Sequence, residues 1–168
     1  PGSLVKVAGG SGNGVAEGRD LVVERRGGTL DFTATQDGKQ VIKVHELTFK
    51  GGPAFFYRLS LQELSADAPL PQFASTKTVS SFSWPPAGLA ENAQSKETEP
   101  NNSHAQAQKI SLPCDISGSF FPAADVDTFE FTAKKGDVWW VEVASERLGR
   151  PTDPSILVQH VSGEGAEQ

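Results

Sequence analysis

The strongest constraint on the fold is a two-residue alternation of apolar and polar side chains within short segments. Leu30 and Phe32 share one face of residues 29–34, and Phe129 and Phe131 share one face of a later segment. Successive side chains of a strand point to opposite faces, so this period indicates half-buried strands. Turn signals separate the segments at intervals typical of all-β proteins. The pattern therefore predicts an antiparallel sheet or sandwich.

These segments fall into two blocks, residues 19–61 and 99–161. Between them, residues 62–98 are rich in Pro, Ser and Thr, which favours an extended linker. Residues 1–18 are Gly-rich, a composition typical of mobile segments, and 162–168 form a tail. The expected strands cover 21–23, 29–34, 41–49, 54–61, 116–120, 127–133, 138–144 and 156–158. A further short strand is expected around Phe82 and Trp84, and one helical turn within 103–109.

Composition narrows the classes of function. The 168-residue chain carries a net charge of −6, and its longest basic runs are two residues long, so we expect no nucleic-acid partner. No apolar run approaches the ~18 residues that a membrane span needs. The single cysteine, Cys114, cannot form an internal disulfide. Because the sequence starts at Pro1 and contains no Met, we expect it to be a piece of a longer polypeptide.

Side-chain oxygens gather in two stretches of the second block. The candidate ligands are Glu97, Glu99, Asn101, Asn102, Asp125 and Asp127. Calcium takes six to eight oxygens from carboxylates, amides, carbonyls and water. Two carboxylates two residues apart on an extended segment point the same way, which suits a shared cation. The alternative is a capped turn, because Asn and Asp also bond to nearby backbone groups.

Residues 138–144 contain two neighbouring tryptophans. Trp139 shares a face with Val141 and Val143, whereas Trp140 shares the opposite face with Glu142. One indole is therefore expected in the core. Trp140 is the candidate ligand contact, because an exposed aromatic side chain offers a large contact area at low entropic cost. The alternative is that another part of the protein buries Trp140.

Catalytic patterns are weak. None of the three histidines accompanies a G-x-S-x-G motif, which argues against a Ser-His-Asp triad. Cys114 lacks an obvious basic neighbour that would lower the pKa of its thiol. Paired catalytic carboxylates act from opposite sides of a substrate, which Asp125 and Asp127 do not suit. We expect no enzymatic activity in this chain.

Residues 97–158 resemble the first two-thirds of the bacterial pre-peptidase C-terminal (PPC) domain. The matching residues are Glu99-Pro100-Asn101-Asn102, Leu112-Pro113, Ile116-Ser117-Gly118, Asp125-Val126-Asp127 with Phe129 and Phe131, Lys135-Gly136-Asp137, and Glu146 to Pro154. Residues 29–61 are similar to the end of another copy. Their matches are Leu30-Asp31-Phe32, Asp37-Gly38, Val44-His45-Glu46-Leu47 and Tyr57-Arg58-Leu59.

The resemblance implies a jelly-roll-like β-sandwich appended to secreted bacterial enzymes, often peptidases. It extends to the collagen-binding domain of clostridial collagenases, in which an acidic segment and an Asp-containing loop bind calcium. By position, Glu97, Glu99, Asn101 and Asn102 match the acidic segment, and Asp125 and Asp127 fall in the loop. The blocks would form either two partial sandwiches or one permuted sandwich.

The sequence thus predicts a non-catalytic accessory module of a larger secreted or cell-surface bacterial protein. Its expected partners are an extracellular protein or polysaccharide and the neighbouring domains of the parent chain. Calcium is the expected cofactor. The alternative is a structural spacer, or a domain removed on maturation, with no ligand of its own.

Overall fold

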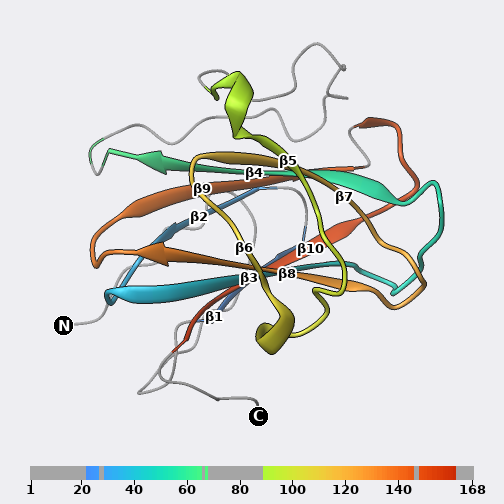
Figure 1. The fold of residues 1–168 in the computed structure, drawn as a ribbon, viewed down its shortest axis with the longest axis horizontal. Coiled ribbons are helices and arrows are strands. Elements are labelled where there is room, and N and C mark those ends of the chain that lie inside the picture. Colours follow the sequence, from blue (N-terminus) through green and yellow to red (C-terminus); the bar gives the residue numbers. More distant parts are fainter. Residues whose placement is uncertain (1–21, 27–28, 66, 68–88, 146–147, 162–168) are drawn as a thin grey trace.

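The fold is a β-sandwich of two packed sheets (Figure 1). The computed structural model describes residues 22–26, 29–65, 67, 89–145 and 148–161. The predicted Gly-rich segment 1–18, the tail 162–168 and the expected strand around Phe82 and Trp84 lie outside the described residues. No helix in the described part is long and apolar enough to cross a membrane.

Each sheet has five strands within the described ranges. Sheet A has the order β1-β10-β3-β8-β6, with bounds Val22–Arg26, Pro154–His160, Gly38–Glu46, Val126–Ala133 and Gln108–Lys109. Sheet B has the order β2-β9-β4-β7-β5, with bounds Thr29–Thr33, Val138–Ala144, Phe56–Leu64, Cys114–Ser119 and Gln94–Lys96. Two short 3-10 helices, η2 (Glu91–Ala93) and η3 (His104–Gln106), precede β5 and β6.

Strands of the two sequence blocks alternate within both sheets. In sheet A, β3 lies between β10 and β8, and Val44 pairs with both Ile156 and Asp127. In sheet B, β4 lies between β9 and β7, and Leu59 pairs with both Val143 and Ile116. The described residues therefore form one sandwich from both blocks, as in the single-sandwich alternative.

The alternating apolar residues fill the space between the sheets. Leu30, Leu59 and Phe129 have no exposed surface, and Trp139 is 5% exposed. The Phe131 and Trp139 rings pack edge to face, with their centroids 5.4 Å apart. Burying a side chain of this size contributes about 1.5–3 kcal/mol, so this core supplies the main stabilisation.

Residues 94–109 form an edge segment that visits both sheets. Its first strand, β5, pairs with β7 in sheet B, and its second, β6, pairs with β8 in sheet A. Both pairs are parallel, whereas the remaining described pairs are antiparallel. The predicted linker 62–98 thus contains the end of β4 and the whole of β5. The side chains of β5 are exposed and polar, so they carry no alternation that the sequence could reveal.

Trp140 is buried, with 3% of its surface exposed. It lies outside the core cluster and pairs across the sheet with Asp31 and Gln62, so it is on the outer face of sheet B. The alternation assigned its face correctly. The exposed ligand contact is not met, whereas the alternative of a buried Trp140 is. Alternation gives the direction of a side chain, whereas exposure depends on what packs over that face.

Candidate metal centre

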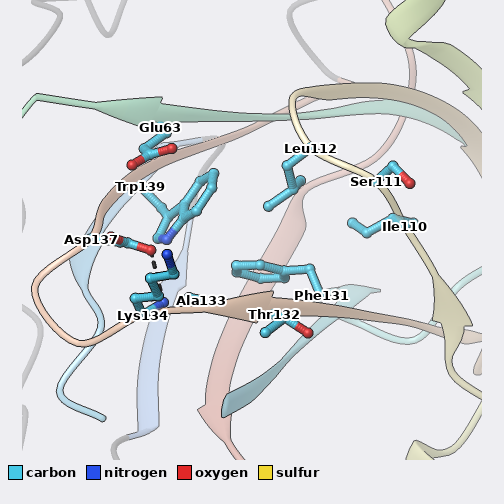
Figure 2. A pocket seen from close by; sticks show the side chains of 10 residues that line it. All are labelled: Glu63, Ile110, Ser111, Leu112, Phe131, Thr132, Ala133, Lys134, Asp137 and Trp139. Carbon is cyan, nitrogen blue, oxygen red and sulfur yellow. Dashed lines mark hydrogen bonds between the residues drawn. The ribbon is translucent and has the colours of Figure 1, made fainter. Parts of the chain in front are cut away.

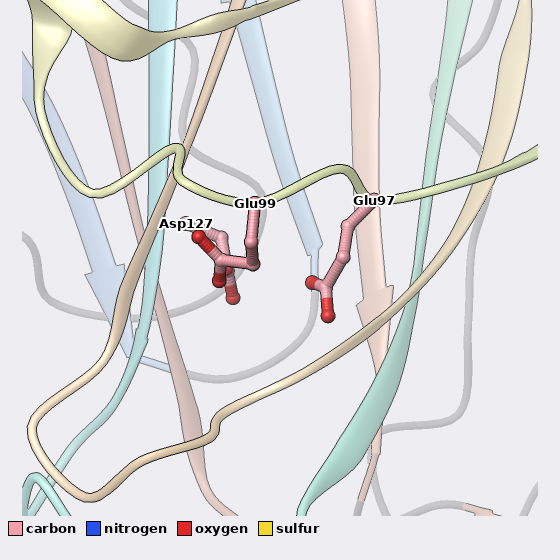
Figure 3. Close-up of side chains that lie close together, drawn as sticks. All are labelled: Glu97, Glu99 and Asp127. Atoms are coloured by element: carbon pink, nitrogen blue, oxygen red, sulfur yellow. The ribbon is translucent and has the colours of Figure 1, made fainter.

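Three carboxylates converge where the edge segment crosses between the sheets. Glu97 follows β5 directly, Glu99 lies two residues further on, and Asp127 is on β8. Each offers one oxygen, and these oxygens lie within 4.8 Å of one another. Figure 3 shows Glu97 and Glu99 projecting from the same side of the edge segment, with Glu99 directed toward Asp127. We call Glu97, Glu99 and Asp127 the acidic cluster.

Sheet B holds the Glu97 carboxylate through three donors. Oε1 accepts hydrogen bonds from Ser119 N at 2.8 Å and Ser119 Oγ at 3.1 Å. Oε2 accepts one from the Tyr57 hydroxyl at 3.1 Å. The Glu97 backbone N–H donates to Ser117 O at 3.0 Å, which continues the pairing of β5 with β7. Glu97 is therefore fixed to β4 and β7 before any ligand binds.

Gly118 makes room for this arrangement. A Cβ atom at position 118 would lie 2.3 Å from Glu97 Oε2 and 2.4 Å from the Tyr57 hydroxyl oxygen. Real Cβ atoms do not approach other atoms this closely, and Tyr57 is fully buried with its ring stacked on Phe120 at a centroid distance of 4.7 Å. The absence of a side chain at Gly118 is therefore required for the contact between Glu97 and Tyr57.

Asp127 is the most unusual member of the cluster. It has no exposed surface, and its Oδ2 accepts no hydrogen bond from the described residues. Burial, together with the charges of Glu97 and Asp125, raises the pKa of the Asp127 carboxyl to about 9. A buried carboxylate without a donor or a counter-charge is costly, so this site favours either a proton or a cation on Asp127.

Asn101 completes the polar wall beside Glu99 and Asp127. It is fully buried, and its backbone carbonyl accepts a hydrogen bond from Thr128 N at 3.0 Å. As placed, its side-chain oxygen faces Glu99 Oε2 at 3.3 Å and Asp127 Oδ1 at 3.2 Å. Turning the amide instead makes its nitrogen a donor to both carboxylates. Oxygens about 3.3 Å apart suit neighbouring ligands of one ion at 2.3–2.6 Å.

The other two predicted ligands do not join the cluster. Asp125 is buried, but its oxygens accept hydrogen bonds from Phe121 N at 2.7 Å and Val126 N at 3.0 Å. The expectation that Asp125 and Asp127 share a cation directly is therefore not met in this geometry. Asn102 is exposed and is not part of the acidic cluster. Asp125 instead shapes the loop that leads into β8.

Sequence reasoning missed Tyr57, Ser119 and Gly118 as parts of this site. Tyr57 lies in the expected strand 54–61 and is fully buried. Burial and the charges of Asp127 and Glu97 raise the pKa of its phenol well above the usual value, so it remains a hydrogen-bond donor. The available signal was the alternation of Tyr57 with Leu59 and Leu61 along this strand.

The arrangement provides oxygen ligands for a hard cation. Glu97, Glu99 and Asp127 supply carboxylate oxygens. The Asn101 amide donates to Glu99 and Asp127 in its hydrogen-bonding orientation, and rotation would present its oxygen to an ion. An ion bound there would contact residues anchored in both sheets. Cys114 takes no part in this site: it is buried, and burial raises the pKa of its thiol to about 12, so it is not a reactive thiolate.

The chain matches no protein-family model, no curated protein and no solved structure. The resemblance to PPC domains therefore stays a prediction from the sequence, and the acidic cluster must be judged from its own geometry.

Proposed function

We propose that this chain is a calcium-stabilised, non-catalytic β-sandwich module of a larger secreted or cell-surface protein. The observation that carries the calcium proposal is the buried Asp127 carboxylate, one oxygen of which lacks a donor, directly beside Glu97 and Glu99. The accessory role and the extracellular location rest on the resemblance noted in the sequence.

The geometry favours calcium over magnesium. The cluster oxygens all lie within 4.8 Å of one another, close enough to bind one ion at the 2.3–2.6 Å distances of calcium. Magnesium demands a near-ideal octahedron at about 2.0–2.1 Å and retains several waters. Glu97 and Asp127 are held by separate strands and contract less easily around the smaller ion.

A bound cation would cross-link the sandwich. Glu97 is attached to sheet B through Ser119 and Tyr57, whereas Asp127 belongs to β8 of sheet A. Glu99 lies between them on the edge segment. The ion would replace the repulsion among three neighbouring carboxylates with attractive contacts. Calcium binding is therefore expected to raise the free energy of unfolding.

The test is thermal unfolding with calcium or with chelator, for the wild type and for Asp127→Asn and Glu99→Gln. Calcium at 1,000 times its Kd is expected to stabilise the wild type by about 4 kcal/mol. In chelator, Asp127→Asn should match or exceed the wild-type melting temperature, because it removes a carboxyl that must take up a proton to stay buried in the folded state. In calcium, the same variant should lose the response.

Glu130→Gln is the matched control, because Glu130 lies on the same strand and pairs with Lys39 at 3.4 Å, outside the cluster. It should keep the full calcium response. If calcium leaves the melting temperature of the wild type unchanged, the acidic residues only cap a turn and the spacer alternative is favoured. If calcium does stabilise the wild type, isothermal titration with calcium and with magnesium separates selective binding from general screening of charge.

A further inference from the structure

An apolar surface lies at the end of the sandwich reached by the last residues of β3. It consists of two loops, 47–55 after β3 and 120–125 before β8, which are adjacent because His45 pairs with Val126. The two large exposed hydrophobic residues of the described chain are Phe49, 50% exposed, and Phe121, 58% exposed. Both lie on these loops.

Nearly every other exposed side chain of the two loops is also apolar. We define the apolar tip as the exposed residues Phe49, Pro53, Ala54 and 121–124, together with Thr48 and Lys50 at its border. Lys50 is the one exposed charge on the two loops. Contiguous exposed apolar surface of this kind marks an interaction site more often than a free face.

The tip is held in a fixed shape. Gly52 N donates to Phe120 O at 3.0 Å, and Ala124 N donates to Phe49 O at 2.9 Å. A Cβ atom at Gly51 would lie 2.6 Å from two carbonyl oxygens of the opposing loop, so the loops meet at van der Waals distance. The tip is therefore pre-organised, which lowers the entropic cost of docking.

Phe49 is also held in a costly conformation. Its φ is 56° and that of Ala124 is 69°, and these are the two non-glycine residues with positive φ in the described chain. A left-handed conformation is strained for a bulky residue, and such strain concentrates at functional sites. The His45 ring stacks on Phe49 at 4.9 Å, which fixes the orientation of the exposed ring.

A complementary cavity lies at the opposite end of the sandwich. Its volume is about 550 Å³, and Figure 2 shows Leu112, Phe131 and Trp139 forming its apolar walls. Phe131 pairs with Gln40, near the first residue of β3, whereas the tip follows the last. The eight residues of β8 separate the two features by about 25 Å. The indole Nε1 of Trp139 is buried and has no partner among the described residues.

The rim of the end cavity complements the tip in charge. Glu63 and Asp137 on the rim oppose a single lysine, Lys134, which leaves the rim net negative. The tip brings Lys50 as its one charge. The tip is also remote from both ends of the described chain, since Val22 pairs with Gln159 and Val161 N donates to Lys39 O. The described chain therefore begins and ends away from the tip.

We propose that the apolar tip docks into the end cavity of a second copy of this chain, giving head-to-tail association. Phe121 and Phe49 contact the apolar walls of the cavity, and Lys50 faces Glu63 and Asp137. Because the two surfaces lie at opposite ends, the contact is heterologous and leaves one tip and one cavity free at the ends of each assembly. This proposal does not depend on the calcium site.

The test uses analytical ultracentrifugation of the chain from about 1 µM to about 1 mM, the range of weak contacts. The tip variant is Phe49→Ser with Phe121→Ser. The cavity variant is Ser111→Arg with Thr132→Arg, both exposed lining positions. Each is expected to weaken association about tenfold or more. The control, Ala105→Arg with Gln106→Arg, adds the same charge on exposed η3 positions and should associate like the wild type.

Mixing the two variants gives the decisive result. Each variant alone should stay monomeric. An equimolar mixture should form a heterodimer, because the cavity variant has an intact tip and the tip variant has an intact cavity. Assembly should stop at the heterodimer, because this contact uses both intact surfaces. Circular dichroism melting checks that both variants are folded. A wild type that stays monomeric at about 1 mM, a mixture that does not pair, or a closed dimer that ignores the cavity variant would each overturn the proposal.

Discussion

Glu46 and Asp127 are both buried carboxylates near ends of sheet A strands, yet their surroundings are opposite. Glu46 Oε2 accepts hydrogen bonds from Thr48 N and Thr48 Oγ1, each at 2.8 Å, and from Lys50 N at 2.9 Å. Asp127 Oδ2 accepts none from the described residues. Burial acts to raise the pKa of Glu46, but these donors outweigh it and the pKa is lowered. The pKa of Asp127 rises to about 9.

The difference shows that burial alone does not define a functional carboxylate. Glu46 caps a turn, and its charge is already stabilised by backbone N–H groups, so it needs no ligand. Asp127 faces two further carboxylates and its Oδ2 accepts no hydrogen bond from the described residues, so the site favours a proton or a cation on this carboxyl. The number of donors per buried oxygen therefore separates a structural acid from a candidate metal ligand.

The largest expected effect that tests this contrast is a pH dependence of stability in chelator. Above about pH 4 an unfolded aspartate has lost its proton, whereas folded Asp127 keeps it toward pH 9. Raising the pH from 5 to 8 should therefore lower the free energy of unfolding, by up to about 1.4 kcal/mol per pH unit. Denaturant titrations at several pH values measure this slope.

Two comparisons sharpen that result. Asp127→Asn should flatten the decline, and saturating calcium should do the same to the wild type. Glu46, with its lowered pKa, contributes stability that is lost only on acidification below the pKa of an unfolded glutamate. A wild type that gains stability between pH 5 and 8 in chelator would contradict the assignment of Asp127.

A smaller effect is expected from Gly118→Ala. The added Cβ would lie 2.4 Å from the Tyr57 hydroxyl oxygen, and the buried ring cannot move freely. Overpacking of this kind costs about 2 kcal/mol, and it should also weaken calcium binding by displacing Glu97. Thermal melting measures the loss of stability, and calorimetric titration measures the loss of calcium affinity. Ser117→Ala, on the same strand, should leave both nearly unchanged, and equal effects of the two substitutions would count against a specific role for Gly118.

The smallest effect is expected from Glu46→Gln. The amide oxygen can still accept from Thr48 and Lys50, but the charge-assisted part of these bonds is lost, at about 1 kcal/mol. The calcium response should be unchanged, because Glu46 is outside the cluster. Chemical denaturation with and without calcium tests both statements. A lost calcium response in this variant would remove the distinction drawn between the two acids.

The sequence predicted the sandwich because strands with one face toward the core alternate apolar and polar residues. Leu30, Phe32, Phe129 and Phe131 alternate with polar residues, and all four are buried. The edge strand β5 escaped prediction because Gln94–Lys96 is polar and exposed along its whole length. The parallel pairing of both edge strands was equally hidden, since register and direction depend on partners far away in the chain.

The candidate site was predicted only in part, again because local sequence patterns do not report long-range contacts. Glu97, Glu99 and Asp127 were chosen from residue type and local spacing, and they do converge. Asp125 was chosen on the same basis, but backbone N–H groups engage its oxygens. Tyr57 and Gly118 reach the site through the pairing of β4 with β7, a long-range contact that no local pattern encodes.

The interleaving of the two blocks has a consequence for how the chain folds. In the described part, none of β1 to β4 pairs with another of these four; each finds its neighbours among β7 to β10. During synthesis, the first block must therefore wait until the last strands leave the ribosome. Contacts so distant in sequence make folding slow, on the order of milliseconds to seconds. Throughout that interval the nascent strands keep their edges open to chaperones and to misassembly.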